Sequence, residues 1–271
     1  MNIYTMLEKA LLSECIEIKK QYTEQCLRYC SQNKIIVYPE LQPKNFEVPS
    51  YFNRCKIVEP KALRTRKDFD TFEGLATLVH SIAHIEFSAI DLALDAVYRF
   101  PQMPTNYKID WLEVALDEIR HFSMLENLLL DLGFSYGSFP VHSGLHDAGR
   151  DTAENILDRI AIIPRYYEAS GLDVSPQIIK KLENKRKLPM VKRLIDCLHI
   201  IYEEEIEHVQ KGDKWFKYLC QEKSLDESIY FEILDKYKLL EKYRPHINVE
   251  ARKKAGFSCI EIIKLGDIEC S

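Results

Sequence analysis

Hydrophobic residues recur every three or four positions along most of this chain, which is the spacing of one face of an α-helix. The pattern predicts an amphipathic helix over residues 3–32 and an irregular stretch over 33–68, where prolines break any long helix. A further helix is expected after Ser224. Four long core helices are predicted over about 70–100, 107–132, 151–170 and 189–220. The expected fold class is therefore all-α, with a four-helix bundle at its centre.

Local signals set the expected ends of these helices. Gly133 should end the second core helix, because glycine readily takes the left-handed conformation of a helix C-cap. Pro164 should kink the third core helix, and Ser175-Pro176 should open a short basic helix over 178–187. The capping-box pattern, an acid or serine three residues before a glutamate, predicts three helix starts. These are Asp70–Glu73, Asp151–Glu154 and Ser224–Glu227.

Two matching motifs interrupt the apolar stripes of the second and fourth core helices. Each reads acid-Glu-Ile-x-His, at Asp117–His121 and at Glu204–His208. Residues three apart share a helix face, so Glu118 and His121 point the same way, as do Glu205 and His208. A carboxylate on a core-facing stripe is costly unless it is paired or binds a metal. Both pairs are therefore candidate metal ligands.

Two further glutamates occupy core-facing positions. Glu86 lies in the middle of the apolar stripe of the first core helix. Glu168 follows Ala161 and Pro164 on the third, and this is the weakest placement, with Glu154 as the alternative. Glu86, Glu118, Glu168 and Glu205 with His121 and His208 then give the ligand order of di-iron and di-manganese bundles, one Glu from two helices and Glu-x-x-His from the other two.

The chemistry of this set favours two iron ions, with manganese as the alternative. Four carboxylates balance two divalent cations, and mixed oxygen and imidazole ligands suit these metals. Asp117 and Glu204 are expected to accept a hydrogen bond from a ligating histidine of the other helix, with surface ion pairing as the alternative. A helical bundle with buried polar pairs and no metal is the competing interpretation of the whole pattern.

Other histidines leave alternatives open. His84 lies close to Glu86 and either assists it or is a core histidine bonded to the backbone; His80 and His84 are both left out of the ligand set. His142 and His146 fall in a loop expected over 134–149 and either line the mouth of a site or are exposed.

Composition limits the binding partners and the cellular compartment that we expect for this protein. The chain has 271 residues, 46% hydrophobic residues and a net charge of −5, which gives no general attraction to nucleic acid or membrane. We find no apolar run long enough to span a bilayer and no secretory signal at the N-terminus. The eight cysteines are scattered and are interpreted as cytoplasmic thiols. The basic stretches 64–67 and 180–193 are expected to be solvated surface.

The chain resembles the ferritin-like di-iron carboxylate superfamily and, more closely, a bacterial family of uncharacterised ferritin-like proteins. The likeness covers about residues 60–257 and implies Glu168 as the ligand from the third helix. It rests on a set of short stretches: 80–86, 89–95, 111–123, 131–134, 164–165, 168–169, 171–174, 204–208, 215–216 and 245–257. The resemblance implies a ferritin-like bundle and a metal site, and it implies no substrate.

These observations predict a non-haem di-iron protein, and we expect an oxygen-activating oxidoreductase or hydroxylase. Its partners would be dioxygen, an electron donor and an unknown small or macromolecular substrate. The alternatives are a ferroxidase or iron-handling protein, and a metal-stabilised interaction protein without catalysis. The bundle is expected over 69–221, between an extension over 1–68 and a C-terminal helix and tail over 222–271.

Overall fold

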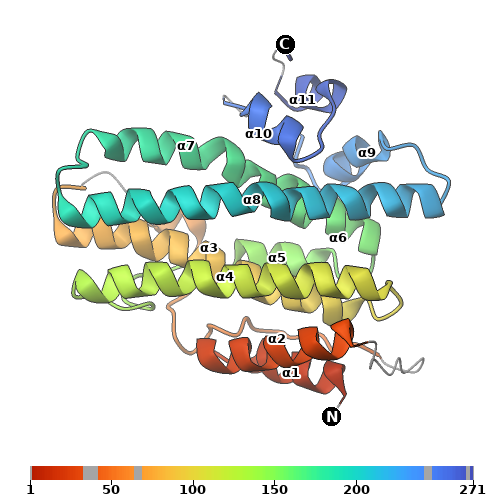
Figure 1. Cartoon of the computed structure of the whole chain (residues 1–271), viewed down its shortest axis with the longest axis horizontal. Helices are drawn as coiled ribbons and strands as arrows, with labels where there is room; N and C mark the ends of the chain where they lie inside the picture. Colours follow the sequence, from red (N-terminus) through yellow and green to blue (C-terminus); the bar gives the residue numbers. More distant parts are fainter. Residues whose placement is uncertain (1, 33–41, 64–68, 241–245, 267–268, 271) are drawn as a thin grey trace. The chain divides into compact units, whose positions relative to one another are not determined.

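The structure, a computed structural model, describes residues 2–32, 42–63, 69–240, 246–266 and 269–270. In these ranges the regular elements are helices, and one isolated bridge joins Ile57 to Val141 (Figure 1). The all-α prediction is confirmed for these residues. The chain divides into two compact units, Met1–Arg150 with Lys187–Cys197, and Asp151–Arg186 with Leu198–Ser271. The predicted basic stretch over 64–67 lies outside the described residues.

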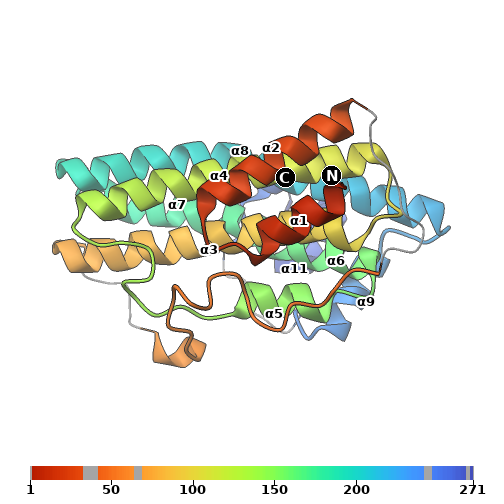
Figure 2. The same cartoon turned by 90° about the horizontal axis from the view of Figure 1, so that it is seen from below.

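The first unit is built around two long helices. The helix α3 packs along α4, and the shorter α1 and α2 pack against this pair (Figure 2). The chain reverses between α3 and α4 in a five-residue turn that contains Pro101 and Pro104. The bounds are α1 Ile3–Leu12, α2 Ile16–Ser31, η1 Pro60–Ala62, α3 Phe72–Arg99, α4 Thr105–Asp131 and α5 Gly144–Asp151.

The ends of α3 and α4 follow local rules. The hydroxyl of Thr71 accepts a hydrogen bond from the Gly74 N–H at 3.1 Å and caps α3, so the expected start at Asp70 is one residue early. Gly133 has φ +85°, and the Phe134 N–H donates to the Leu129 carbonyl at 2.9 Å. This is a Schellman motif, and the predicted glycine C-cap is confirmed.

Two expectations in the first unit are wrong. The single helix expected over 3–32 breaks after Leu12, where the Ser13 N–H bonds back to the Ala10 carbonyl at 3.2 Å. The Ser13 hydroxyl also accepts from the Cys15 N–H at 3.1 Å, and such a local serine turn competes with helical hydrogen bonds. The loop expected over 134–149 contains α5, although its glycines and serines lower helix propensity.

The apolar character of α3 comes from its place in the core. Among the described residues it is the helix long and apolar enough to cross a membrane, by length and composition. The most apolar window of α3 is 78% buried inside the protein. The same stretch carries Glu86, Asp91 and two histidines, which fits a core helix that positions polar groups.

A buried ion pair ties the N-terminal helices to α3. Lys19 of α2 is fully buried, and its ammonium group donates to the Ala10 carbonyl at 2.9 Å and pairs with Asp91. The Ser50 hydroxyl donates to the second oxygen of Asp91 at 2.5 Å. The buried charge of Lys19 is thus paired and hydrogen-bonded, as a buried charge must be, and its partner Asp91 is partly exposed.

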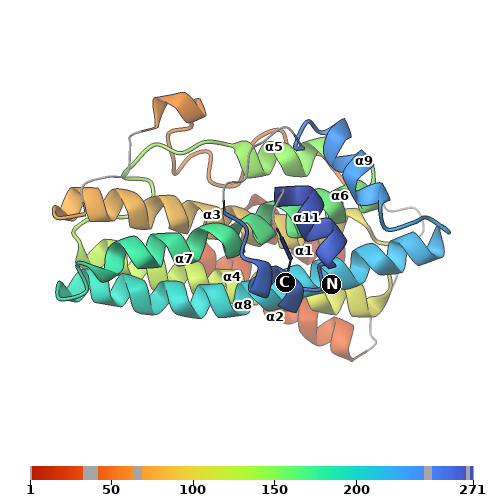
Figure 3. The same cartoon turned by 90° about the horizontal axis from the view of Figure 1, so that it is seen from above.

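The second unit contains a helix of mixed geometry. Figures 1 and 3 show α6, η2 and α7 as one continuous rod, with the second-unit part of α8 running the opposite way beside it. The segment η2 is a π-helix. The bounds are α6 Ile156–Ile162, η2 Ile163–Glu168, α7 Ala169–Glu183, α8 Pro189–Glu222, α9 Ile229–Lys236, α10 Val249–Lys254 and α11 Cys259–Gly266. The four-helix bundle expected over 69–221 draws on both units and stays a prediction.

The third core helix begins later than the sequence predicts and does not end before Gly171. Asp151 ends α5, and Asn155 caps α6 by accepting from the Leu157 N–H at 2.9 Å. At Pro164 the expected kink takes the form of the π-helix, because proline has no N–H to donate to the preceding turn. The rod then continues to Glu183.

Pro176 and Ser224 also behave differently from the prediction. Pro176 lies inside α7, where it cannot donate to the Leu172 carbonyl; the Asn248 side chain donates to that carbonyl instead, at 3.3 Å. The helix expected after Ser224 begins at Ile229, and Ser224 has φ +52°. A residue in that conformation cannot begin a right-handed helix.

The interpretation of all eight cysteines as thiols is wrong for one pair. Cys259 and Cys270 form a disulfide across a sequence separation of 11 residues. The remaining cysteines are free, and Cys26 and Cys30 are buried.

Candidate metal centre

Three of the predicted ligands meet inside the first unit. Glu86 comes from α3, and Glu118 and His121 come from one face of α4. The Nδ1 atom of His121 lies 3.3 Å from a carboxylate oxygen of Glu86 and 3.3 Å from one of Glu118. A ligand atom from each of the three lies within 4.8 Å of the others. The structure therefore brings these residues together as the sequence predicts.

The three side chains lie in the core of the protein. Glu118 and His121 are 0% exposed and Glu86 is 4% exposed. Burial by itself lowers the pKa of His121, but hydrogen bonds to Glu118 and Glu86 and the charges of these carboxylates raise it to about 11. The two carboxylates therefore stabilise a positive charge at this site. That charge is carried either by an imidazolium or by a divalent cation.

Regular helix geometry accounts for this arrangement. Glu118 and His121 are three residues apart and thus share a face of α4. Glu86 lies in the middle of α3, which packs along α4. Oxygen and imidazole donors that converge in a buried place could hold a divalent metal ion.

The second unit holds the other three predicted ligands. On α8 the Nδ1 atom of His208 lies 3.7 Å from a carboxylate oxygen of Glu205, and His208 is 1% exposed. Glu168 is the last residue of the π-helix and is partly buried. The second Glu-x-x-His pair is thus formed on its helix face as expected.

A close contact between two helices places Glu168 and His208 at a similar height along the helix pair. A Cβ atom added at Gly212 of α8 would lie 2.4 Å from the Cβ atom of Pro164, so only glycine fits between α8 and the π-helix. The two helices run in opposite directions (Figure 3). Glu168 lies four residues after Pro164, and His208 lies four before Gly212. Both ligands therefore lie about one turn from the contact, on the same side of it.

The two acids expected to support the histidines are placed differently. Asp117 accepts a hydrogen bond from Arg120 at 3.0 Å, and both side chains are substantially exposed. This is the surface ion pair that the sequence leaves open. Glu204 is partly buried on α8. The predicted bonds from Asp117 and Glu204 to histidines of the other helix stay predictions.

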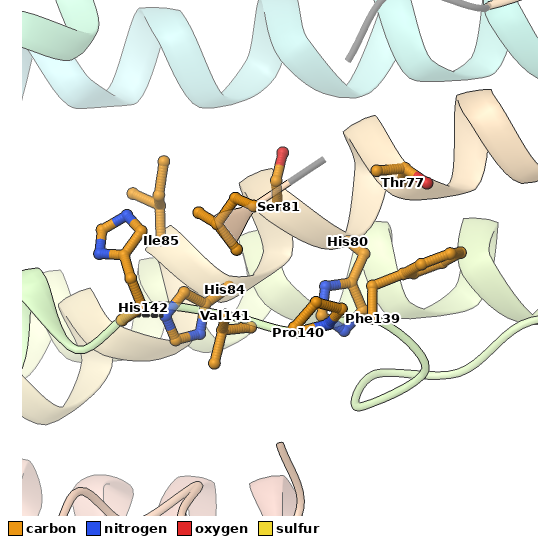
Figure 4. A pocket seen from close by; sticks show the side chains of 10 residues that line it. Thr77, His80, Ser81, His84, Ile85, Phe139, Pro140, Val141 and His142 are labelled. Atoms are coloured by element: carbon orange, nitrogen blue, oxygen red, sulfur yellow. Dashed lines mark hydrogen bonds between the residues drawn. The ribbon is translucent and has the colours of Figure 1, made fainter. Parts of the chain in front are cut away.

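A second group of histidines in the first unit lines a small cavity of about 40 Å³ (Figure 4). The ring nitrogens of His84 bond to the Tyr136 hydroxyl at 2.9 Å and to the His142 carbonyl at 2.8 Å. His80 accepts from the Gly137 N–H at 2.9 Å, and burial, together with His84, lowers its pKa to about 4. The interpretation of His84 as a core histidine bonded to backbone is confirmed.

The loop histidines also have local roles. His142 lines the cavity in Figure 4 and accepts from the Gly144 N–H at 3.0 Å. His146 lies 3.7 Å from Asp147. Neither joins the cluster at Glu118.

Sequence reasoning missed a group of charged residues beside the second half of the ligand set. Arg165 lies in the π-helix three residues before Glu168 and is 0% exposed. It pairs with Asp213 of α8 and Glu261 of α11. An arginine just after the apolar run 160–163 was the available signal, but its partners lie 48 and 96 residues away in sequence, beyond the reach of any helical spacing.

Comparison with known proteins shows a family to which the chain is similar. A family described as "Protein of unknown function (DUF455)" matches residues 12–263. An "Uncharacterized protein" of Haemophilus influenzae is 33% identical over 276 aligned positions, which cover 99% of this chain and 93% of that protein. No solved structure matches the chain.

Proposed function

The chain belongs to the DUF455 family of proteins of unknown function, and from its own residues we propose that it is a ferritin-like di-metal carboxylate protein. The proposed metal is iron, with manganese as the alternative, and the proposed activity is oxygen-dependent oxidation of a substrate still to be identified. The observation that carries the proposal is the buried cluster of Glu86, Glu118 and His121.

Charge supports a metal over a plain polar core. Two carboxylates with one imidazole lie where they are almost wholly removed from water. Buried carboxylates are retained when they are paired or bind metal. A set of oxygen and nitrogen donors without thiolate suits iron or manganese, whereas many zinc sites are built from cysteine. The donor set of the first unit therefore fits the proposed ions.

The second unit is proposed to supply the remaining ligands, Glu168, Glu205 and His208. This part rests on the sequence order of Glu followed by Glu-x-x-His, which occurs twice. Di-metal carboxylate bundles take their ligands from four helices in the same combination. Four carboxylates would balance the charge of two divalent cations. Asp117 and Glu204 are proposed to orient the two histidines.

When bound, a pair of reduced iron ions supplies electrons to dioxygen. The residues of the chain hold the ions, exclude water from the core, and adjust the charge around them. His121 takes part in this adjustment, because its raised pKa means that the imidazole loses a proton when it becomes a ligand. Regions outside the bundle are proposed to bind the substrate, since storage of iron alone needs little beyond four helices.

The experiment is a metal measurement on paired variants. Purified protein loaded anaerobically with Fe(II) should contain about two irons per chain by mass spectrometry, as in bundles of this ligand order. Glu118→Ala with Glu205→Ala should abolish binding. The matched control is Glu113→Ala with Glu207→Ala, the same change at exposed positions of the same two helices. Full metal content in the first variant would refute the assignment.

The response to oxygen then separates the functions. A change in the optical spectrum on admitting oxygen, without stored iron, supports the oxidoreductase. Large assemblies by sizing and many irons per chain would favour iron handling. Metal that stays inert to oxygen would favour a metal-stabilised interaction protein.

A further inference from the structure

Arg165 occupies an unusual position for a charged side chain. Its guanidinium is fully buried and lies within 4.6 Å of the ring centres of Phe216, Tyr230 and Phe257. Cation–π contacts of this kind strengthen when water is excluded. The Tyr230 hydroxyl also donates to the Arg165 carbonyl at 2.9 Å. The π-helix is thus held at Arg165 by both its side chain and its backbone.

Two carboxylates from different helices complete this environment. Arg165 lies 2.9 Å from Asp213 of α8 and 2.7 Å from Glu261 of α11. Ser258 donates to Glu261 from its N–H and its hydroxyl, each at 2.9 Å. Burial raises the pKa of Glu261, but the charge of Arg165 and these hydrogen bonds lower it below its ordinary value. Glu261 is therefore ionised and fixed in place.

A second buried arginine holds the other side of Glu168. Arg252 of α10 is fully buried, pairs with Asp173 at 2.6 Å and donates to the Ala169 carbonyl at 3.2 Å. Phe257 lies 5.1 Å from the guanidinium of Arg252 and 4.6 Å from that of Arg165. One C-terminal segment, residues 248–262, therefore contacts the chain on both sides of Glu168.

We propose that this C-terminal segment is a clamp that keeps residues 163–168 in π geometry and so positions Glu168 as a metal ligand. Arg165, Asp213, Glu261 and Arg252 are then positioning residues. The inference rests on the proposed function for the role of Glu168, and on the described contacts for the clamp itself.

The physical need for a clamp comes from the π-helix. Such turns are rare and usually occur at functional sites, and they need support from their surroundings. Return of the segment to α geometry would rotate Glu168 by roughly 100° about the helix axis, one residue's share of a turn. A carboxylate turned that far would no longer point in its present direction. The clamp thus decides which way Glu168 points.

The test compares two Glu→Gln changes in the same C-terminal region. Glu261→Gln removes a charge from Arg165, and Glu250→Gln removes one from a surface pair with Lys254. In metal-free protein, Glu261→Gln should speed amide hydrogen exchange in 163–168 by about tenfold, as loss of a buried partner opens the segment. Its Mn(II) affinity by calorimetry should fall about 10–100-fold, and Glu250→Gln should match the wild type in both.

The outcomes separate the clamp from the proposed function. Unchanged exchange in 163–168 would overturn the clamp, whatever the metal does. Faster exchange with unchanged Mn(II) affinity would overturn the positioning of Glu168. A wild type that binds no Mn(II) or Fe(II) would refute the proposed function, and the exchange result would still decide the clamp. If Glu261→Gln does not fold, Ser258→Ala removes one of the hydrogen bonds to Glu261 and should give a smaller shift of the same sign.

Discussion

The two Glu-x-x-His motifs are nearly identical in sequence, yet the units around them are built differently. In the first unit Glu118 and His121 lie on a regular helix, and Glu86 reaches them from the middle of another regular helix. In the second unit the predicted partner, Glu168, ends a π-helix. Regular geometry is enough for the first arrangement, whereas the second depends on residues far away in the chain.

In each unit a terminal segment anchors a core helix through an ion pair. In the first, Lys19 reaches Asp91, five residues after Glu86. In the second, Glu261 reaches Arg165, three residues before Glu168. The anchored helix is regular in one case and irregular in the other. Loss of the first anchor should therefore cost stability alone, whereas loss of the second should also move a ligand.

The largest expected effect is loss of the first anchor. Lys19→Met should lower the free energy of unfolding by about 3 kcal/mol, because it leaves the largely buried carboxylate of Asp91 without its cation. Urea denaturation measures this. Lys20→Met, at the exposed neighbouring position, should change it by less than about 0.5 kcal/mol. Adding Asp91→Asn to Lys19→Met should recover part of the loss, and no recovery would contradict the ion-pair explanation.

The next effect concerns the close contact in the second unit. Gly212→Ala should cost about 2–3 kcal/mol, because the new Cβ would meet the rigid ring of Pro164 and force the helices apart. Gly171→Ala is the control: it lies in α7, and nothing lies within 4 Å of the added Cβ. It should stabilise by about 0.5–1 kcal/mol. Thermal unfolding measures the stability of both variants. Equal changes in stability would refute the close contact between Gly212 and Pro164.

These cases show how far the sequence predicts the molecule. Helix faces are local, so Glu118 and His121, and the C-cap at Gly133, could be predicted from spacing alone. Helix starts were missed at Asp70, Asp151 and Ser224, because a capping box only proposes a start, and neighbouring residues such as Thr71 and Asn155 supply the caps instead. The π-helix was missed as well.

The missed features at Pro164 and Pro176 share a physical cause, because each depends on a partner far away in the sequence. Pro164 removes a hydrogen bond, but whether the chain kinks, stops or widens there depends on what holds the next residues. Here that is Arg165 with Glu261, 96 residues away, and no periodic pattern links them. The same applies to Asn248, which bonds to the carbonyl that Pro176 cannot serve.

A smaller effect on stability depends on pH and comes from the first unit. His80 in the first unit is buried and neutral, with its pKa lowered from 6.5 to about 4. The unfolded chain then binds the proton more readily, so this stabilisation is present above pH 6.5 and is lost as pH falls toward 4. Between pH 7 and pH 5 the loss is about 2 kcal/mol. Urea denaturation at both pH values should show a drop in the wild type that is smaller by this amount in His80→Asn; equal drops would contradict the burial.

The smallest expected change in stability concerns Asp117, and it tests the remaining sequence prediction about the first motif. Its pair with Arg120 is exposed, so Asp117→Asn should alter the free energy of unfolding by less than about 0.5 kcal/mol. If Asp117 also orients a ligating histidine, Mn(II) affinity should fall about 10–100-fold in this nearly unchanged protein. Asp110→Asn on the same helix is the control and should leave affinity unaltered. Because the two roles differ in metal affinity and hardly at all in stability, unchanged affinity in Asp117→Asn would leave Asp117 as a surface ion pair and restrict the first motif to Glu118 and His121.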